Sequence, residues 1–334
     1  MKQILFRADG NSQIGLGHVM RCLALAEMLG PGYDRRFAIV QPTPEISWLI
    51  QEKGVLIIVL ETNESPNLLA VIRPDDVVVL DGYSFSEPYQ RMVRQKAQKL
   101  VFIDDLLEGY QVADVVINHA GAVTEYDYQA EPYTQFLLGT RYLLLRPEFF
   151  RPVSPTPAEG TIFVSLGGVD LHNVSARVLD GLRMVFRQLG QSWRVHLVVG
   201  PFHPNRAGLV AYEEYIEDLT VLSKLSAAQM VSELEQCQLA IVACSTVAYE
   251  ACALSRPILP VKTADNQTQL AKFFTADLGT AFLQYDDSVS FFATQIRTAL
   301  TSPGLTELLQ KRRSRLFDGQ SPERFRQLFA RLCA

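Results

Sequence analysis

Short, almost uninterrupted aliphatic runs recur through the first 120 residues and restrict the fold of this chain more than any other feature. They occupy residues 36–40, 55–60, 76–81, 100–105 and 113–118. Strands that are buried on both faces of a parallel sheet have this composition, whereas strands with one exposed face alternate polar and apolar residues. Segments with a helical pattern, such as 46–51 and 87–98, separate the runs. The alternation predicts an α/β protein with a doubly wound parallel sheet.

The alternation stops between Gly121 and Gly160, where tyrosines and prolines gather, and then restarts. Further strands are predicted at 161–166, 195–200, 239–243 and 257–261, and further helices at 173–189 and 266–274. A chain of 334 residues is long enough for two domains. We therefore predict two Rossmann-like parallel-sheet domains facing across a cleft. The predicted segments are an N-terminal domain 1–145, a linker 146–160, a C-terminal domain 161–315, and a helix within 316–334 that can pack back on the N-terminal domain.

A strand, a glycine-bearing turn and a helix open the chain, at residues 3–9, 10–17 and 18–29. This arrangement builds anion sites in α/β proteins, because unpaired helical N–H groups point at the ligand. Here it also places the imidazole of His18 at the start of the helix. The helix dipole disfavours the protonated ring there, and a neutral imidazole can take a proton from water. We predict that His18 is a catalytic base; the alternative is a histidine that caps the helix or packs in the core.

Polar residues follow several of the predicted strands, where ligands bind in open α/β sheets. Helix capping is the favoured interpretation of Asp104 and Asp114, while Asp9 and Asp81 fit a cap or a site equally well. Arg21 shares a helix face with His18, being three residues further on. A cation in the first helical turn opposes the dipole, so we expect Arg21 to have a compensating partner.

In the second half, the Gly167-Gly168 turn and the Ser245-Thr246 pair each stand where a strand meets a helix. Such positions hold phosphate oxygens through N–H and hydroxyl groups. Glu250, just over one turn further, can accept hydrogen bonds from ribose hydroxyls. Each feature also has a purely structural alternative, namely a tight turn, a helix cap and a surface glutamate. The same holds for the 266–267 pair, which fits a helix cap, and for the Asp81-Gly82-Tyr83 segment, which fits an aromatic packing contact.

Several classes of function are excluded or disfavoured by what the sequence lacks. The net charge of −5 argues against a nucleic-acid partner. No apolar run approaches the roughly 20 residues of a membrane span. The five cysteines and five histidines show no disulfide framework and no metal-ligand spacing. There is no Walker loop and no third glycine of the dinucleotide fingerprint. We expect a cytoplasmic, monomeric protein without metal or cofactor, whose partner is a small molecule.

The motifs together resemble one family. Those that carry the resemblance are FRADGNSQIGLGHVMRCLALA at 6–26, DGY at 81–83, IDD at 103–105, RPEFF at 146–150, SLGGVD at 165–170, ACSTVAYEACALSRPILPV at 243–261 and ADNQTQLAKFF at 264–274. They are similar to those of the PseG family, the UDP-sugar hydrolases of pseudaminic acid biosynthesis. The first motif is the most specific, while the C-terminal ones are shared with MurG-like glycosyltransferases. The resemblance implies the two-domain GT-B fold.

The resemblance also implies a reaction, the metal-independent hydrolysis of UDP-2,4-diacetamido-2,4,6-trideoxy-β-L-altropyranose. His18 matches the catalytic base, Tyr83 and Asn266 match the sugar and water site, and Glu250 matches the ribose-binding glutamate. The other predicted substrate-binding residues are Arg7, Asp9, Gly17, Arg21, Asp81, Arg146 and Gln267. The other predicted nucleotide-binding residues are Gly167, Gly168, Ser245 and Thr246. The turn at 243–246 carries fewer glycines and serines than is usual in the family, which leaves the phosphate contacts open.

The predicted mechanism is attack of a His18-activated water on the anomeric carbon, with inversion. The main alternative is a MurG-like inverting UDP-sugar glycosyltransferase, in which the base activates a sugar hydroxyl. A sugar-nucleotide binding protein without catalysis and a UDP-sugar epimerase are further alternatives.

Overall fold

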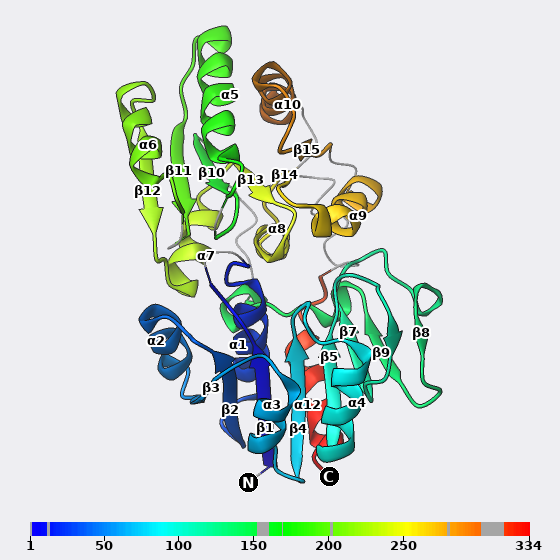
Figure 1. The fold of residues 1–334 in the computed structure, drawn as a ribbon. Coiled ribbons are helices and arrows are strands. Elements are labelled where there is room, and N and C mark those ends of the chain that lie inside the picture. Colours follow the sequence, from blue (N-terminus) through cyan, green and yellow to red (C-terminus); the bar gives the residue numbers. More distant parts are fainter. Residues whose placement is uncertain are drawn as a thin grey trace. The chain divides into compact units, whose positions relative to one another are not determined.

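A computed structural model describes residues 2–11, 14–151, 160–168, 170–200, 203–278, 281–301 and 317–334. The chain divides into two compact units. Unit 1 comprises residues 1–147 and 319–334, and unit 2 comprises residues 148–318. Each unit is built around its own parallel sheet (Figure 1).

Within its described residues, unit 1 has a seven-stranded parallel sheet in the order β3-β2-β1-β4-β5-β7-β9. The strands are β1 Lys2–Ala8, β2 Tyr33–Val40, β3 Leu56–Leu60, β4 Asp76–Asp81, β5 Lys99–Ile103, β7 Val115–Asn118 and β9 Gln135–Leu138. A small separate sheet pairs β6 Tyr110–Gln111 with β8 Gln129–Ala130. The helices are α1 Gly17–Leu29, α2 Pro44–Glu52, α3 Ser65–Val71, α4 Glu87–Lys96 and α12 Ser321–Leu332, with 3-10 turns η1 Glu125–Asp127 and η2 Thr140–Tyr142. The turn η3 Pro147–Phe150 crosses into unit 2.

The aliphatic runs form the central strands of this sheet, as their composition predicts. Every residue of β4 is buried, as are the last five of β1. One face packs on α3 and α4 through a cluster that includes Leu5, Val78 and Val93. On the other face, α1 packs against β1 and β4, and α12 packs on α1. Residues on both faces are therefore removed from water, which explains why the strands do not alternate.

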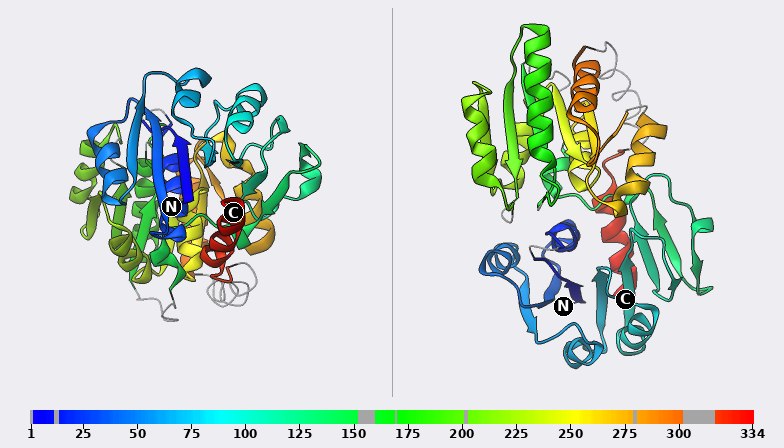
Figure 2. Two further views of the ribbon diagram at one scale, coloured as in Figure 1. Left: turned by 90° about the horizontal axis from the view of Figure 1, so that it is seen from below. Right: turned by 45° about the horizontal axis from the view of Figure 1, so that its top comes forward.

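The two ends of the chain both lie in unit 1 (Figure 2). The Nζ of Lys2 donates to the backbone oxygen of Ala330 at 2.8 Å. Arg326 donates to the backbone oxygen of Met28, at the end of α1, at 3.2 Å. The helix α12 thus completes a layer of the first sheet even though it is more than 170 residues away from the rest of unit 1 along the chain.

Within its described residues, unit 2 has a six-stranded parallel sheet in the order β12-β11-β10-β13-β14-β15. The strands are β10 Thr161–Ser165, β11 Arg194–Val199, β12 Leu219–Ser223, β13 Leu239–Ala243, β14 Ile258–Lys262 and β15 Leu283–Gln284. The helices are α5 Val174–Leu189, α6 Arg206–Val210, α7 Ala227–Glu235, α8 Thr246–Ala253, α9 Thr268–Leu278 and α10 Val289–Thr301, with 3-10 turns η4 Ala211–Glu214 and η5 Asp265–Gln267. The core of this unit joins α5 and α10 to one face of the sheet.

Some expectations about local structure are wrong. Asp104 accepts hydrogen bonds from Leu106 and Leu107 in a loop, and no helix follows there. Asp114 accepts from the backbone N–H of Leu100 and pairs with Lys99, so it ties strands together and caps no helix. The predicted helix at 266 begins as the turn η5, and α9 starts at Thr268. The helix predicted within 316–334 is observed as α12, and residues 302–316 before it lie outside the described residues.

Candidate active site

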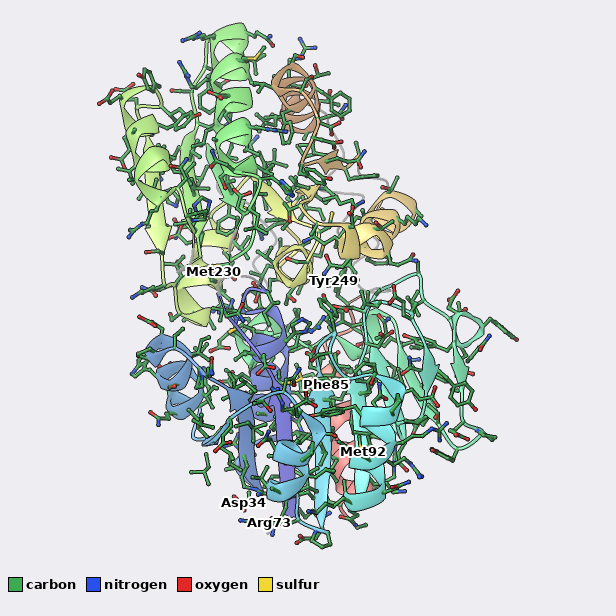
Figure 3. All side chains as sticks on the ribbon, viewed as in Figure 1. Asp34, Arg73, Phe85, Met92, Met230 and Tyr249 are labelled. Atoms are coloured by element: carbon green, nitrogen blue, oxygen red, sulfur yellow. The ribbon has the colours of Figure 1, made fainter. Side chains whose placement is uncertain are left out.

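The candidate catalytic residues lie at a switch point in the strand order of unit 1. The chain runs outward from β1 to β2 and β3 on one side and then from β4 to β5 and β7 on the other. Ala8 at the end of β1 pairs with Asp81 at the end of β4. Figure 3 shows Asp34 and Arg73, which lie where strands begin, at the opposite end of unit 1 from Phe85, which follows β4. Ligands bind at the carboxyl ends of strands next to such a switch point.

Three predicted residues meet at this point through short hydrogen bonds. The Nδ1 of His18 lies 2.7 Å from Oδ1 of Asp81. Arg21 donates from Nε to Oδ2 of Asp81 at 2.9 Å and from Nη2 to Oδ1 at 2.6 Å, a two-pronged contact with one carboxylate. Asp81 is fully buried, and His18 and Arg21 are 5% and 7% exposed. The predicted shared face of His18 and Arg21 is therefore real, and Asp81 is the partner that Arg21 requires.

These contacts assign the imidazole tautomer. Nη2 of Arg21 also lies 2.8 Å from Nδ1 of His18, yet Nδ1 cannot donate to Asp81 and accept from Arg21 together. Burial raises the pKa of Asp81, but Arg21 and His18 outweigh burial and hold it below its usual value, so the carboxylate is charged. A charged carboxylate accepts and does not donate. Nδ1 therefore carries the proton, and Nε2 is left with a lone pair that can accept one.

The arginine is held between two carboxylates. Its Nη1 donates to Oδ2 of Asp105 at 2.7 Å. Burial lowers the pKa of Arg21, but Asp81 and Asp105 outweigh it and raise that pKa well above the usual range. The cluster thus places one permanent cation between two acidic side chains, and a positive charge formed on the His18 ring during a reaction would lie beside the Asp81 carboxylate.

The predicted residue Tyr83 also lies beside this network, together with Asp105 and His119, which were not predicted as site residues. The ring of Tyr83 stands edge-on to His18 with centroids 4.6 Å apart, and its hydroxyl lies 3.4 Å from Asp105. Burial and Arg21 lower the pKa of His119, which follows β7, to about 4, so this imidazole is neutral at pH 7. The sequence feature that could have identified Asp105 as a site residue is its position after an aliphatic run. For His119 the corresponding feature is only its position after a predicted strand.

Two predicted substrate-binding residues are fully buried. Arg7 donates to both oxygens of Asp9 and to Asn63. Asp81 is equally buried and can act only through His18 and Arg21. Asp9 is partly exposed and also accepts from the backbone N–H of Val40, which ties together the ends of β1 and β2. Arg7 and Asp9 thus bond to each other and stabilise the sheet where β1 and β2 end.

The remaining predicted residues of unit 1 have different positions. Gly17 is the first residue of α1, directly before His18. A Cβ added to it would meet no atom within 4 Å, so the helix start is open at this point. Arg146 is half-buried and lies next to η3. None of the contacts described above joins Arg146 to the His18 network.

In unit 2 the predicted nucleotide-binding and substrate-binding residues follow three neighbouring strands. Gly167-Gly168 follow β10, Ser245-Thr246 follow β13, and Asn266-Gln267 follow β14, and β13 lies between the other two strands. The switch point of this sheet falls between β10 and β13. Ser245 is the N-cap residue of α8, and Glu250 lies within that helix, 5% exposed. Strand order therefore brings these separate motifs to one edge.

The start of α5 is already occupied by a carboxylate. Asp170 accepts from the backbone N–H groups of Val174 and Ser175, both at 2.8 Å, and lies 3.3 Å from Nε2 of His203. An anion at this helix start would have to displace Asp170. Next to it, a Cβ on Gly200 would lie 2.1 Å from the backbone oxygen of Gly168, so position 200 requires glycine. The start of α8 is therefore the better candidate for phosphate binding. The Gly167-Gly168 turn follows the neighbouring strand and packs closely on Gly200.

Asp170→Ala is expected to lower the free energy of unfolding by about 1–2 kcal/mol at pH 7, the usual cost of losing a helix cap. Burial raises the pKa of Asp170, but His203 and the N–H groups at the start of α5 outweigh burial and lower it. The folded state therefore binds fewer protons than the unfolded state, in which the pKa is about 3.9. The stabilisation is present above pH ~4 and is lost as the pH falls further.

Urea unfolding at pH 7 and at pH 3 measures this difference. Asp286→Ala is the matched control, since Asp286 is exposed in the same unit. An Asp170→Ala protein as stable as the control at pH 7, or equally destabilised at both pH values, would contradict the assignment of Asp170 as a charged cap.

The two residues of the last predicted pair, Asn266 and Gln267, have different surroundings in the structure. The Oε1 of Gln267 accepts from the backbone N–H of Thr263 at 2.8 Å, so its amide holds the turn between β14 and α9. Asn266, beside it in η5, is exposed. Among the described residues, no group of three or more His, Cys, Asp or Glu side chains could hold a metal ion. No helix in the described parts of the chain has the length and apolar character needed to cross a membrane.

Comparison of the sequence with known proteins finds two informative relatives, and no family model matches. The chain is 26% identical over 186 residues to UDP-2,4-diacetamido-2,4,6-trideoxy-beta-L-altropyranose hydrolase of Campylobacter jejuni, covering 54% of this chain and 65% of the relative. It is also 26% identical over 219 residues to the uncharacterized protein MJ1062 of Methanocaldococcus jannaschii, covering 60% of this chain and 43% of the relative. The chain thus spans less than two thirds of the length of either relative.

Solved structures match over almost the whole chain. The spinosyn rhamnosyltransferase SpnG, complexed with thymidine diphosphate, superposes with a TM-score of 0.70 at 14% identity, covering 99% of this chain and 100% of SpnG. MurG of Acinetobacter baumannii superposes with a TM-score of 0.65 at 17% identity, covering 99% and 100%. The predicted fold class is confirmed: the chain has two parallel-sheet α/β domains, the GT-B fold of these glycosyltransferases. The resemblance to the PseG hydrolases is confirmed as a similarity of sequence.

Proposed function

We propose that this protein is a UDP-sugar hydrolase in which His18 is the general base. The observation that carries the proposal is the hydrogen bond between Nδ1 of His18 and the buried carboxylate of Asp81, which leaves Nε2 as a proton acceptor at the carboxyl edge of the sheet. Its similarity to a UDP-sugar hydrolase and the GT-B fold support enzymatic action on a UDP-sugar.

In the proposed reaction, Nε2 of His18 takes a proton from water as the water oxygen attacks the anomeric carbon. The bond from that carbon to the phosphate oxygen breaks, and UDP leaves with the bonding electrons. A single displacement inverts the anomeric centre. Asp81 stabilises the imidazolium that forms and keeps the ring oriented, and Arg21 holds the carboxylate in place through its contact with Asp105. Tyr83 limits how the imidazole can turn.

The proposed nucleotide site belongs to unit 2. Glu250 binds the ribose hydroxyls, and the N–H groups at Ser245 and Thr246 bind the diphosphate together with the Gly167-Gly168 turn. Donors fixed at a helix start stabilise the charge that develops on the leaving phosphate. Asn266 and Tyr83 contact the sugar and the attacking water. The cleft between the two domains that the resemblance implies stays a prediction.

The finer assignment follows from the family resemblance. We propose UDP-2,4-diacetamido-2,4,6-trideoxy-β-L-altropyranose as the substrate, in pseudaminic acid biosynthesis, with no metal or cofactor, in a cytoplasmic monomer. The rival is a MurG-like inverting UDP-sugar glycosyltransferase, and the GT-B fold is compatible with it. The two reactions differ only in the nucleophile, which is water in one and a sugar hydroxyl in the other.

Incubation of the purified protein with this UDP-sugar in oxygen-18 water, without any acceptor, tests the proposal. We expect stoichiometric release of UDP and free sugar, with the label in the sugar, because attack at carbon puts the water oxygen on carbon. Label in UDP would mean cleavage at phosphorus. UDP release that requires an added sugar acceptor would establish the transferase and overturn the hydrolase.

A further inference from the structure

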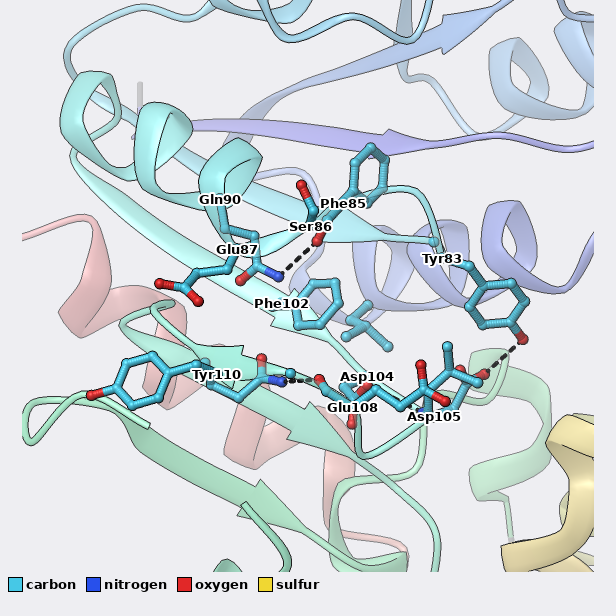
Figure 4. A pocket seen from close by; sticks show the side chains of 15 residues that line it. Tyr83, Phe85, Ser86, Glu87, Gln90, Phe102, Asp104, Asp105, Glu108 and Tyr110 are labelled. Atoms are coloured by element: carbon cyan, nitrogen blue, oxygen red, sulfur yellow. Dashed lines mark hydrogen bonds between the residues drawn. The ribbon is translucent and has the colours of Figure 1, made fainter. Parts of the chain in front are cut away.

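A pocket of about 280 Å³ lies in unit 1 beside the His18 network (Figure 4). The start of α4 and the loop after β5 form its walls. Tyr83, which contacts the His18 ring, and Asp105, which binds Arg21, both line it. The pocket is therefore one side chain away from the proposed base. Its volume is near the lower end of small-molecule sites and suits a substituted sugar better than a larger ligand.

Two buried amide oxygens distinguish this pocket. Gln90 and Gln111 line it and are 3% and 1% exposed. Their amide nitrogens donate to the backbone oxygens of Phe85 and Glu108, at 2.9 and 3.0 Å. These bonds fix which end of each amide is oxygen. Neither Oε1 has a hydrogen-bond donor in the described part of the chain, and each has less than 1 Å² of accessible area. A buried acceptor without a donor is costly, so both oxygens favour a ligand that offers N–H or O–H.

The rest of the lining restricts that ligand further. The charged residues are all acidic: Glu87, Asp104, Asp105 and Glu108. Ionised carboxylates among them disfavour a further anion here. Phe85 and Phe102 supply apolar surface. A sugar carboxylate is therefore disfavoured, whereas a neutral group with an N–H donor and a methyl group matches both the oxygens and the rings.

We propose that this pocket binds an acetamido substituent of the sugar and selects for it. Its N–H donates to Oε1 of Gln90 or Gln111 as the wall side chains move aside on binding, and its methyl packs on Phe85 and Phe102. A ring hydroxyl at the same carbon offers no methyl group for these rings. The proposal rests on the proposed function, because it requires the sugar to be held over His18.

Binding can be tested separately from turnover. The ligand is UDP-2,4-diacetamido-2,4,6-trideoxy-β-L-altropyranose, and the protein is His18→Ala with isotope-labelled phenylalanine, which should bind the ligand without consuming it. We expect nuclear Overhauser effects between an acetamido methyl and the ring of Phe102 or Phe85. Binding without any such effect would overturn the pocket assignment.

Selectivity is the second measurement. Gln90→Leu and Gln111→Leu remove the oxygens, and Gln95→Leu, at an exposed position of the same helix α4, is the matched control. The substrates are the diacetamido sugar nucleotide and UDP-6-deoxy-β-L-altropyranose, which has hydroxyls at the two positions. We expect at least one pocket variant to lower the ratio of kcat/KM values for the two substrates about tenfold, and the control to leave it unchanged.

Different results would contradict the pocket assignment and the hydrolase assignment. A general loss of folding lowers both kcat/KM values and leaves their ratio unchanged, so an unchanged ratio in both pocket variants would contradict selection by these amides. A wild-type protein that releases no UDP from the diacetamido sugar nucleotide, yet gives the methyl-to-Phe102 effects in the His18→Ala protein, would overturn the hydrolase and support the pocket.

Discussion

Replacing His18 by alanine is expected to lower kcat by about a thousandfold or more while leaving the affinity for UDP nearly unchanged. The loss is large because general base catalysis contributes roughly 10²–10⁴-fold. UDP affinity is preserved because the proposed nucleotide residues all belong to unit 2. Steady-state UDP release and isothermal titration with UDP measure the two quantities.

The reciprocal control is Glu250→Gln. This change weakens UDP binding by removing the charge that accepts from the ribose hydroxyls, while the His18 network is left intact. His18→Ala with near-normal turnover would remove His18 from the mechanism. A Glu250→Gln protein that binds UDP as tightly as wild type would remove Glu250 from the nucleotide site without affecting the base.

Asp81→Asn is expected to lower kcat by about a hundredfold or more with little change in KM. The carboxamide removes the charge that stabilises the imidazolium, and its NH2 group can donate to Nδ1 and so select the wrong tautomer. Steady-state kinetics of the wild-type and variant proteins measure kcat and KM. An unchanged kcat in the variant would remove Asp81 from the mechanism.

The stability of this variant needs its own control, because Arg21 is left buried with Asp105 as its remaining carboxylate partner. Asp105→Asn removes the other carboxylate of the same guanidinium and leaves the bond between Asp81 and His18. Thermal unfolding compares the two variants, and we expect similar destabilisation but a much smaller loss of kcat for Asp105→Asn. Equal losses of kcat would mean that the network acts as a whole and that Asp81 has no special role.

The strands are the part of the fold that the sequence alone predicts well. The run 76–81 is β4 with its bounds correct, and the opening strand, turn and helix appear as β1 and α1. Continuous aliphatic composition signals burial on both faces, and that signal is local. The roles of polar side chains that bond to distant segments are less predictable from the sequence. Asp104 follows a strand as Asp81 ends one, yet it serves a loop because no helix follows it. Asp114 stands just before β7 and bonds to the neighbouring strand β5.

The candidate site also combines features that the sequence predicts with features that only the structure shows. The sequence alone determined that His18 begins a helix after a glycine turn and that Arg21 shares its face, because both follow from spacing within one helix. Only the tertiary structure decided that Asp81, 63 residues away, bonds Nδ1 of His18, that Asp105 holds Arg21, and that Gln90 and Gln111 line one pocket. Strand order brings these residues together. The pairing of β1 with β4 is a contact between segments far apart in the chain, and no local pattern of residues records it.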